Sequence, residues 1–170
     1  MVRAFIKRDA EALAEVYRDA VRSIGPQAYT PEQVGTWALY PEDLEEFRSR
    51  LSRGFTLVAE EGKEVVAFGQ LEPDDHLAFL YCRGSVSRKG VGSQLYVALE
   101  AQAVAKGVSE IHTEASRISR PFFEKHGYSV VEIERVVRHG VEFERFRMSK
   151  KLANKALERT GLRPAAQLER

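Results

Sequence analysis

The spacing of apolar residues changes near residue 55, and this change limits the folds open to the chain more than any other feature of the sequence. Upstream of it, apolar side chains recur at helical intervals, as at Leu13, Val16 and Ala20. Downstream, the short apolar runs FTLVAEE and EVVAFGQLE flank Gly62-Lys63, which is typical of a hairpin turn. A third run, HLAFLYC, follows a PDD turn. The pattern therefore predicts helices first and a group of strands after them.

Residues at the ends of the early helices support this prediction. Residues 2–6 have the pattern of a short strand, and Asp9 is placed to cap the helix that follows. Thr30 and Gln33 stand at the first and fourth positions of TPEQVGTWA, in a capping-box pattern. YPEDLEEFRSRL repeats this proline-plus-acid start, and Gly54 is expected to end the helix. Two or three helices are therefore expected before residue 55.

The second half of the chain alternates again between helix and strand. A helix to Lys106 is expected after the third apolar strand, followed by the strand EIHTEA and the short helix RISRPFFEKHG. YSVVEIERVVR and VEFERFRM are predicted to form a terminal hairpin around His139-Gly140, with a bulge near Glu144-Arg145 where the apolar phase shifts. This order predicts an α+β protein with mixed strand directions and helices on the faces of its sheet.

Composition excludes several classes of protein. The 26 lysines and arginines nearly balance the 25 aspartates and glutamates and are dispersed among them, which argues against a nucleic-acid partner. No stretch approaches the length of a membrane span, and MVRAFIKRDA lacks the apolar core of a signal peptide. Cys82 is the single cysteine, so no internal disulfide forms. We therefore expect a cytoplasmic protein without membrane contact, with one domain over residues 1–150 and a loosely attached tail over residues 151–170.

The turn between the third apolar strand and the next helix, SVSRKGVGSQ, carries two glycines and two cations. The first N–H groups of a helix lack intrahelical partners and carry partial positive charge. Gly90 and Gly92 let a ligand approach this backbone, and Arg88 and Lys89 add full charges. A pyrophosphate would suit such a site. A tight turn with solvated cations has the same spacing, so the spacing leaves both interpretations open.

Longer stretches on both sides of this turn resemble a known family. LYCRGSVSRKGVGSQLYVALEAQAVAKG resembles motif A of the GCN5-related N-acetyltransferases (GNAT), and ISRPFFEKHGYSVVEIERV resembles their motif B. The resemblance covers about residues 2–150 and extends to a small bacterial subgroup of the superfamily. It implies the GNAT fold, with a mixed, mostly antiparallel sheet of about seven strands and helices on both faces. It also implies an enzyme that moves an acetyl group from acetyl-CoA directly to an amine, without a metal.

The resemblance assigns the acetyl-CoA site residue by residue. The glycine turn is expected to hold the pyrophosphate, and the end of the strand before it is expected to pair with the pantetheine amides like an added strand. The pyrophosphate residues are Arg88, Lys89, Gly90, Val91, Gly92 and Ser93, and the strand residues are Leu80, Tyr81 and Cys82.

The sequence departs from the family pattern at three positions around this site. Ser87 replaces the Gln or Arg that usually begins the pyrophosphate loop. Ser116 replaces the Asn that follows the fifth strand, and it remains a polar partner for the donor. Phe123 replaces a Tyr that often serves as general acid to the departing thiolate, so it can wall the pantetheine channel but cannot donate a proton. This loss keeps a second function open, a CoA-binding sensor or regulatory module with degenerate catalysis.

Three residues are candidates for proton transfer. His76 aligns with the position of a base glutamate in the histone-acetylating branch of the family, and an imidazole titrates near neutral pH. The alternative is that His76 only begins a strand. Glu114, at the end of the fifth strand, is the competing base, and Tyr81 is the candidate proton donor to the thiolate. The other histidines lack companions at ligand spacing, so no metal site is expected.

The acceptor side carries fewer signals. Trp37 and Tyr40 follow the early helices, which wall the acceptor in this fold, and their alternative role is packing in the core. The expected acceptor is a small-molecule or peptide amine. A third class of function also stays open, an interaction protein whose glycine turn is purely structural and which forms a homodimer through the terminal hairpin.

Overall fold

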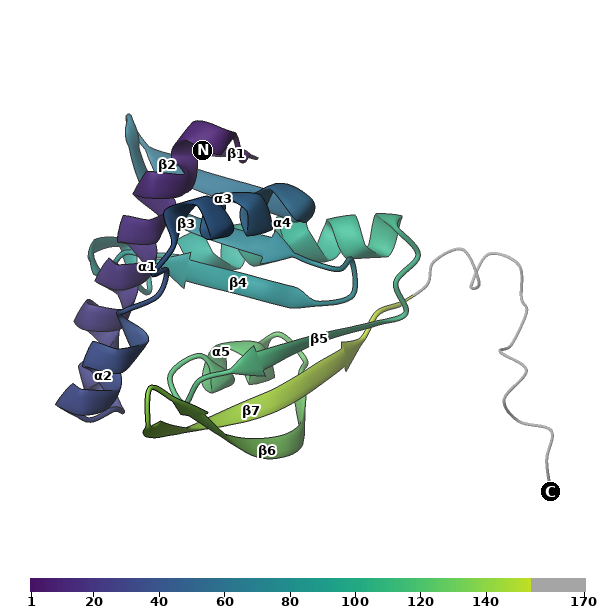
Figure 1. Ribbon diagram of the computed structural model, residues 1–170. Helices are drawn as coiled ribbons and strands as arrows, with labels where there is room; N and C mark the ends of the chain where they lie inside the picture. The colour runs from purple at the N-terminus through teal and green to yellow at the C-terminus, as the bar shows by residue number, and fades with distance from the viewer. Residues whose placement is uncertain (154–170) are drawn as a thin grey trace, which may run out of the picture.

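The computed structural model describes residues 1–153, and its elements follow the predicted order (Figure 1). The strands are β1 (Val2–Ala4), β2 (Phe55–Glu61), β3 (Glu64–Leu71), β4 (Leu77–Cys82), β5 (Glu110–Ala115), β6 (Ser129–Arg138) and β7 (Val141–Lys151). The α-helices are α1 (Ala10–Ile24), α2 (Pro31–Trp37), α3 (Leu44–Arg53), α4 (Val91–Ala105) and α5 (Arg120–Lys125). Short 3-10 turns are η1 (Lys7–Asp9), η2 (Gly25–Gln27) and η3 (Gly84–Val86).

The strands form two sheets that meet at their edges. β1, β2, β3 and β4 make a four-stranded sheet in that order, and β5, β7 and β6 make a three-stranded sheet, with antiparallel neighbours throughout. Within the described residues, one parallel bridge joins the sheets, between His76 and His112. At this bridge the His112 N–H donates to the carbonyl of Asp75 over 2.9 Å. The predicted α+β fold with seven mostly antiparallel strands is confirmed, and its parallel contact is confined to the start of β4 and β5.

A bulge turns β4 away from β5 beyond this bridge. Gln70 pairs with Phe79 and Leu71 pairs with Leu77, so Ala78 is an extra residue in β4. A bulge bends its strand and ends regular pairing beside it. Figure 1 shows β4 and β5 running in the same direction and diverging toward their carboxyl ends. In the part of the chain that the structure describes, the second half of β4 therefore has no strand partner on the side of β5.

Helices cover both faces of the sheets. α1 and α3 pack on one face of the four-stranded sheet, where Leu13, Phe47 and Phe68 are fully buried. α4 packs on the opposite face through Leu95 and Leu99, whose four-residue spacing matches one stripe of a helix. The fold thus has an α1 side and an α4 side, each with its own apolar core.

The predicted helix starts are confirmed in part. The Gln33 N–H donates to Thr30 Oγ1 over 3.2 Å and the Thr30 N–H donates to Gln33 Oε1 over 3.0 Å, which is the expected capping box. Asp9 directly precedes α1, but its carboxylate accepts from Arg3 and from the Ile6 N–H instead of from the helix. The guanidinium on β1 is a charged donor, and its hydrogen bonds to this carboxylate are stronger than those of a neutral N–H group.

The predicted bulge near Glu144-Arg145 is wrong. Both residues pair regularly with β6, and the irregularity of this hairpin lies on β6, where Val131 is the extra residue. The apolar phase of β7 shifts because its two faces are covered in turn. Phe143 packs toward the α1 side and Phe146 toward the α4 side. An unbroken strand that is buried first on one face and then on the other has the same apolar pattern as a bulged strand.

The carboxyl end of the described chain belongs to the fold. β7 runs to Lys151, and Leu152 is buried on the α4 side, with its N–H donating to the carbonyl of Ser109 over 2.8 Å. The rest of the predicted tail, residues 154–170, lies outside the described residues. Over residues 1–153, no helix combines the length and apolar character that a membrane crossing needs.

Candidate active site

The turn after β4 leaves backbone N–H groups available at the start of α4. Gly90 precedes the helix and has a left-handed backbone with φ of 86°, and Arg88 is also left-handed with φ of 61°. The Gln94 N–H donates to the carbonyl of Gly90 over 3.0 Å and closes the first helical turn. The N–H groups before it have no partner within the helix and carry the positive end of the helix dipole. Such a row of N–H groups suits a phosphate-type anion.

Two glycines keep the approach to these N–H groups open. A Cβ at Gly90 would have no other atom within 4 Å, and a Cβ at Gly92 would meet only Cys82 Sγ at 3.4 Å. Arg88 and Lys89 are exposed next to the turn. The residues that the sequence assigned to the pyrophosphate thus surround an open helix start, and they fit a pyrophosphate group.

A contact between η3 and α1 holds the turn in place. The Gly84 N–H donates to Asp19 Oδ2 of α1 over 2.8 Å, and a Cβ at Gly84 would lie 2.6 Å from Ser23 Cβ. Glycine is therefore required where η3 docks against α1. The sequence gives no signal for this contact, because the carboxylate and the backbone group that it accepts from are 65 residues apart.

The strand residues assigned to pantetheine lie on alternate sides of β4. Leu80 and Cys82 pack toward the α4 side, whereas Tyr81 packs toward the α1 side. Burial raises the pKa of the Cys82 thiol to about 11, so the thiol stays protonated at neutral pH. Cys82 is therefore a packing residue, and the part of these residues that a donor can use is their backbone.

Tyr81 is surrounded by aromatic rings of the α1 side. Its ring centroid lies 4.4 Å from that of Tyr17 and 5.9 Å from that of Phe68. Burial raises the pKa of its hydroxyl above the ordinary value. This environment favours a packing role for Tyr81 over the predicted role of proton donor.

Ser116 and Phe123 both follow β5. The Ser119 N–H donates to Ser116 Oγ over 3.0 Å and the Ser116 N–H donates to Ser119 Oγ over 2.9 Å, so the two serines close the turn into α5. Phe123 is 4 % exposed, and its ring lies 5.1 Å from that of Tyr128 within the core of the α4 side. The position that the family often fills with a tyrosine thus carries a buried ring without a polar group.

His76 and Glu114, which the sequence treats as competing bases, form one pair where β4 and β5 meet. His76 Nε2 lies 2.6 Å from Glu114 Oε2, and His76 Nδ1 lies 3.0 Å from the carbonyl of Glu72. Both neighbours accept hydrogen bonds, so the doubly protonated imidazolium satisfies both. The hydrogen bond to Glu114 accordingly raises the pKa of His76 above its ordinary value, and the same bond lowers the pKa of Glu114. The two side chains are 19 % and 30 % exposed, so a ligand can reach them.

A hollow of about 570 Å³ opens beside this pair on the outer face of the three-stranded sheet. It is lined by Asp75, Glu110, His112, Glu114, Val131, Glu134, Arg147, Met148 and Ser149. The His112 ring stacks on that of His76 with 4.8 Å between centroids. The lining carries more carboxylates than guanidinium groups, so it is acidic. The sequence does not indicate a role for His112 or for this lining, because the residues come from separate strands that meet only in the folded sheet.

Trp37 and Tyr40 gather around Tyr17 on the α1 side. Trp37 Nε1 donates to the Tyr17 hydroxyl over 2.8 Å. The Tyr40 ring lies 5.1 Å from that of Tyr17, and the Tyr40 hydroxyl accepts from Arg50 over 3.3 Å. Both side chains are partly exposed and both extend the apolar core, so they join the aromatic group of Tyr81 and not the His76–Glu114 pair.

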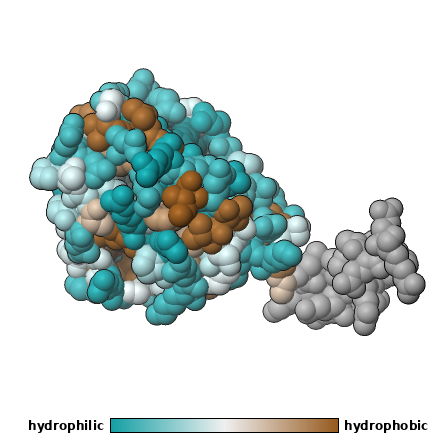
Figure 2. Space-filling view, turned by 90° about the horizontal axis from the view of Figure 1, so that it is seen from below, coloured by the Kyte–Doolittle hydropathy of each residue, from teal (hydrophilic) through white to brown (hydrophobic). Residues whose placement is uncertain are grey.

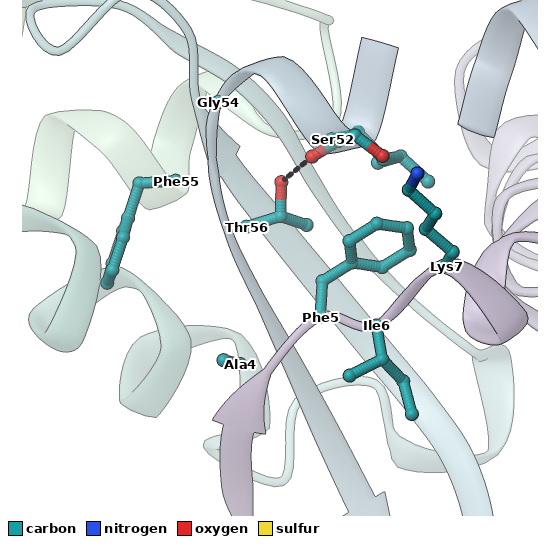
Figure 3. A pocket seen from close by; sticks show the side chains of 9 residues that line it. Ala4, Phe5, Ile6, Lys7, Ser52, Gly54, Phe55 and Thr56 are labelled. Carbon is teal, nitrogen blue, oxygen red and sulfur yellow. Dashed lines mark hydrogen bonds between the residues drawn. The ribbon is translucent and has the colours of Figure 1, made fainter. Parts of the chain in front are cut away.

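A second hollow lies apart from the residues assigned to acetyl-CoA. A hollow of about 390 Å³ lies between the end of β1 and the start of β2, where the Thr56 hydroxyl donates to the carbonyl of Leu51 over 2.8 Å (Figure 3). Phe5, Ile6 and Lys7 line this hollow, and none of the residues assigned to acetyl-CoA does. Among residues 1–153, no three His, Cys, Asp or Glu side chains lie close enough together to hold a metal ion.

Known proteins resemble this chain over nearly all of its described length. A sequence profile described as "Acetyltransferase (GNAT) domain" matches residues 26–152. A curated relative, "Uncharacterized N-acetyltransferase YafP" from Escherichia coli (strain K12), is 28 % identical over 148 residues, which are 86 % of this chain and 93 % of the relative.

Solved structures show the same relationship. A crystal structure from Rhodopseudomonas palustris, described as "GCN5-Related N-acetyltransferase: Aminotransferase, Class-II", is 30 % identical with a TM-score of 0.86, over 89 % of this chain and 95 % of that one. The PaiA N-acetyltransferase from Thermoplasma acidophilum in complex with coenzyme A is 21 % identical with a TM-score of 0.73, over 89 % and 98 % of the two chains, and it shows the fold alone. The chain therefore belongs to the GNAT acetyltransferase family and is an N-acetyltransferase that moves an acetyl group from acetyl-CoA to an amine.

Proposed function

We propose that the His76–Glu114 pair takes the proton of a cationic amine, whose nitrogen then attacks the thioester carbonyl of acetyl-CoA lying along β4. The C–S bond breaks as the amide forms, and CoA leaves as the thiol with the second proton that the nitrogen loses. The observation that carries this proposal is that the imidazole and the pyrophosphate-binding turn lie at opposite ends of the same strand. The imidazole stands at the start of β4, and the open start of α4 follows its end. The six residues of β4 span roughly 20 Å, a length that an extended pantetheine arm can follow.

The chain offers backbone groups along this whole path. Between Arg88 and Ser93, the N–H groups suit the pyrophosphate except that of Lys89, which donates to the Val86 carbonyl over 3.3 Å. The unpaired edge of β4 at Leu80–Cys82 offers N–H and C=O groups to the pantetheine amides. Ser116, in the turn before α5, and Phe123, within α5, are proposed to close the far side of this channel. Acetyl-CoA itself supplies the activated thioester.

The His76–Glu114 pair supplies the proton acceptor. Most amines are protonated at neutral pH, and only the neutral form is a nucleophile. The neutral imidazole of His76 accepts the proton of the ammonium group, and the Glu114 carboxylate, 2.6 Å away, stabilises the imidazolium that results. The Glu72 carbonyl fixes the ring from its other nitrogen at 3.0 Å. His76 and Glu114, which the sequence offers as alternative bases, are thus proposed to act together as one.

The acidic hollow supports a cationic acceptor. Asp75, Glu110 and Glu134 line it together with Glu114, and Arg147 is the guanidinium among them. A small-molecule or peptide amine that carries a further positive charge would be attracted by such a lining. Trp37 and Tyr40 are proposed as the apolar wall of the acceptor path on the α1 side.

We also propose that the protein works in the cytoplasm and as a homodimer. Its single cysteine leaves no internal disulfide, which fits a reducing compartment. The exposed edge of β6 supports self-association.

A CoA-binding regulator with degenerate catalysis is the second candidate. The buried, hydroxyl-free ring of Phe123 favours it, because no proton donor stands where family members often protonate the leaving thiolate. An assay of acetyl transfer to amines separates the two functions.

The test measures thiol release from acetyl-CoA with a panel of polyamines, aminoglycosides and peptide N-termini. We expect turnover with a cationic amine, and we expect His76→Ala to lower kcat/KM by about 10²-fold or more while CoA binds as tightly as before. Tyr81→Phe serves as the control variant and is expected to retain most of the activity. Tight CoA binding without turnover on any amine would favour the regulator, and the absence of CoA binding would exclude both functions.

A further inference from the structure

β6 is the outer edge of the three-stranded sheet. Its ten residues pair with β7 on one side, and no strand of residues 1–153 pairs with it on the other. Val131, Ile133 and Val137 expose 56 %, 57 % and 67 % of their surface. Figure 2, which views the molecule from the side of β6, shows apolar patches on a largely hydrophilic surface. A long exposed edge with apolar side chains is a template for pairing with another strand.

Resting on the homodimer proposed above, we infer that its two copies associate through β6, paired as antiparallel strands around a two-fold axis at Arg135. In such a pair, residues at equal distances on either side of the central residue lie opposite each other. Glu132 then faces Arg138 of the second copy, and Ile133 faces its Val137. Symmetry makes each of these pairs occur twice, and both types of pair stabilise antiparallel strands.

The charges around the axis agree with this register. Among the described residues Arg138 has no carboxylate within ion-pair distance, so it is free to meet Glu132 of the second copy. Glu132 has an exposed partner on its own chain, Arg147 at 3.1 Å, and can accept a second cation. The two copies of Arg135 meet at the axis, where each is neutralised by Glu142 of its own chain at 3.0 Å.

Neighbouring registers lack this match. Moving the axis by one residue to Glu134 places Ile133 opposite Arg135 and Glu132 opposite Val136. Moving it to Ile133 places Glu132 opposite Glu134, and moving it toward the carboxyl end places Arg135 opposite Val137. None of these registers keeps both the Glu132–Arg138 and the Ile133–Val137 pairs, so the register centred on Arg135 is the favoured one.

Sedimentation analysis of the full chain over a range of concentrations tests the inference. The wild-type protein is expected to dimerise. Arg138→Glu and Glu132→Arg are each expected to raise the dissociation constant by about tenfold or more, because each variant places two pairs of like charges across the axis. The double variant restores both pairs with reversed polarity, so its dissociation constant should return toward the wild-type value. Lys63→Glu, in the β2–β3 turn, makes a similar charge change elsewhere and should leave the dissociation constant unchanged.

Apolar variants test the same surface without changing charge. Ile133→Thr keeps a β-branched residue in the strand and should weaken the dimer, whereas Val97→Thr, at a side chain of α4 that is 60 % exposed, should not. A wild-type chain that stays monomeric at all concentrations would overturn the inference. A double charge variant as weak as the single ones would overturn the register. Neither readout depends on acetyl transfer, so both are independent of the proposed base.

Discussion

The imidazole of His76 has an acceptor at each of its nitrogens, the carbonyl of Glu72 and the carboxylate of Glu114. Both acceptors favour the protonated ring, so the pKa of His76 lies above its ordinary value. For a general base this has two consequences. The ring binds a proton more tightly, and a smaller fraction of molecules holds it in the neutral, proton-accepting form at neutral pH.

We predict that kcat/KM for a cationic amine rises with pH through an apparent pKa above 6.5, the ordinary value for histidine. Below the raised pKa the imidazole is protonated and cannot accept a proton, and above it the base form is fully present. Glu114→Gln removes the charge that raises the pKa of His76, so the rising limb should move to lower pH. His76→Ala should remove the limb. These profiles are measured by thiol release, and loss of turnover in Glu114→Gln with retention in His76→Ala would make Glu114 the base.

The thiol of Cys82 gives a prediction about access to the donor site. Its pKa is raised to about 11 and only the thiolate is alkylated, so labelling should be slow at neutral pH and should increase about tenfold per pH unit. The sulfur lies next to Gly92, since a Cβ at that residue would be 3.4 Å from it. Acetyl-CoA bound at the start of α4 should therefore cover the thiol and slow the labelling further. Mass spectrometry of the alkylated protein measures both effects. If the folded protein were labelled at neutral pH as fast as an unfolded control, Cys82 would not be a buried, protonated thiol.

At the scale of elements, short-range signals predicted the structure well and signals between elements did not. The capping box of Thr30 and Gln33 and the left-handed turn at Gly62 were readable because all the interacting groups lie within a few residues. The bulge at Ala78 was missed because it depends on the register with β3. The expected bulge at Glu144-Arg145 was wrong because the sequence does not show that helices cover both faces of β7 in turn.

Two glycines in different elements give opposite predictions for stability. A Cβ at Gly69 of β3 would lie 2.6 Å from Leu99 Cδ1 and 3.2 Å from the Phe79 carbonyl, so Gly69→Ala should destabilise the protein by about 1–3 kcal/mol through overpacking. A Cβ at Gly35 within α2 would have no other atom within 4 Å, so Gly35→Ala should stabilise it by about 0.5–1 kcal/mol. Urea unfolding measures both. Equal effects of the two substitutions would show that packing between β3 and α4 is looser than these distances indicate.

At the scale of the whole molecule, the proposed chemistry lies where two sheets meet. The glycine turn at the start of α4 was predictable because its residues, Arg88 to Ser93, are consecutive in the sequence. The His76–Glu114 pair was not, because its members are 38 residues apart and meet only at the bridge between His76 and His112. The bulge at Ala78 opens β4 on the side of β5 directly after this bridge. The same irregularity thus frees the strand edge proposed for the donor and leaves the proposed base at the closed end of the opening.

This arrangement predicts that acetyl-CoA stabilises the folded protein through the start of α4. A ligand at one hundred times its dissociation constant adds about 2.7 kcal/mol, which corresponds to a rise in Tm of roughly 5–10 °C for a chain of this size. Gly92→Val should abolish the rise, because its side chain would fill the approach to the N–H groups, while the Tm without ligand should change little, since the nearest atom to the new Cβ is Cys82 Sγ at 3.4 Å. Gly35→Val is the matched control, since it makes the same change in a helix where no atom lies near, and it should keep the full rise. A full rise in Gly92→Val would mean that the phosphates bind elsewhere, and the β4 edge would then lose the anchor that makes it the path of the donor.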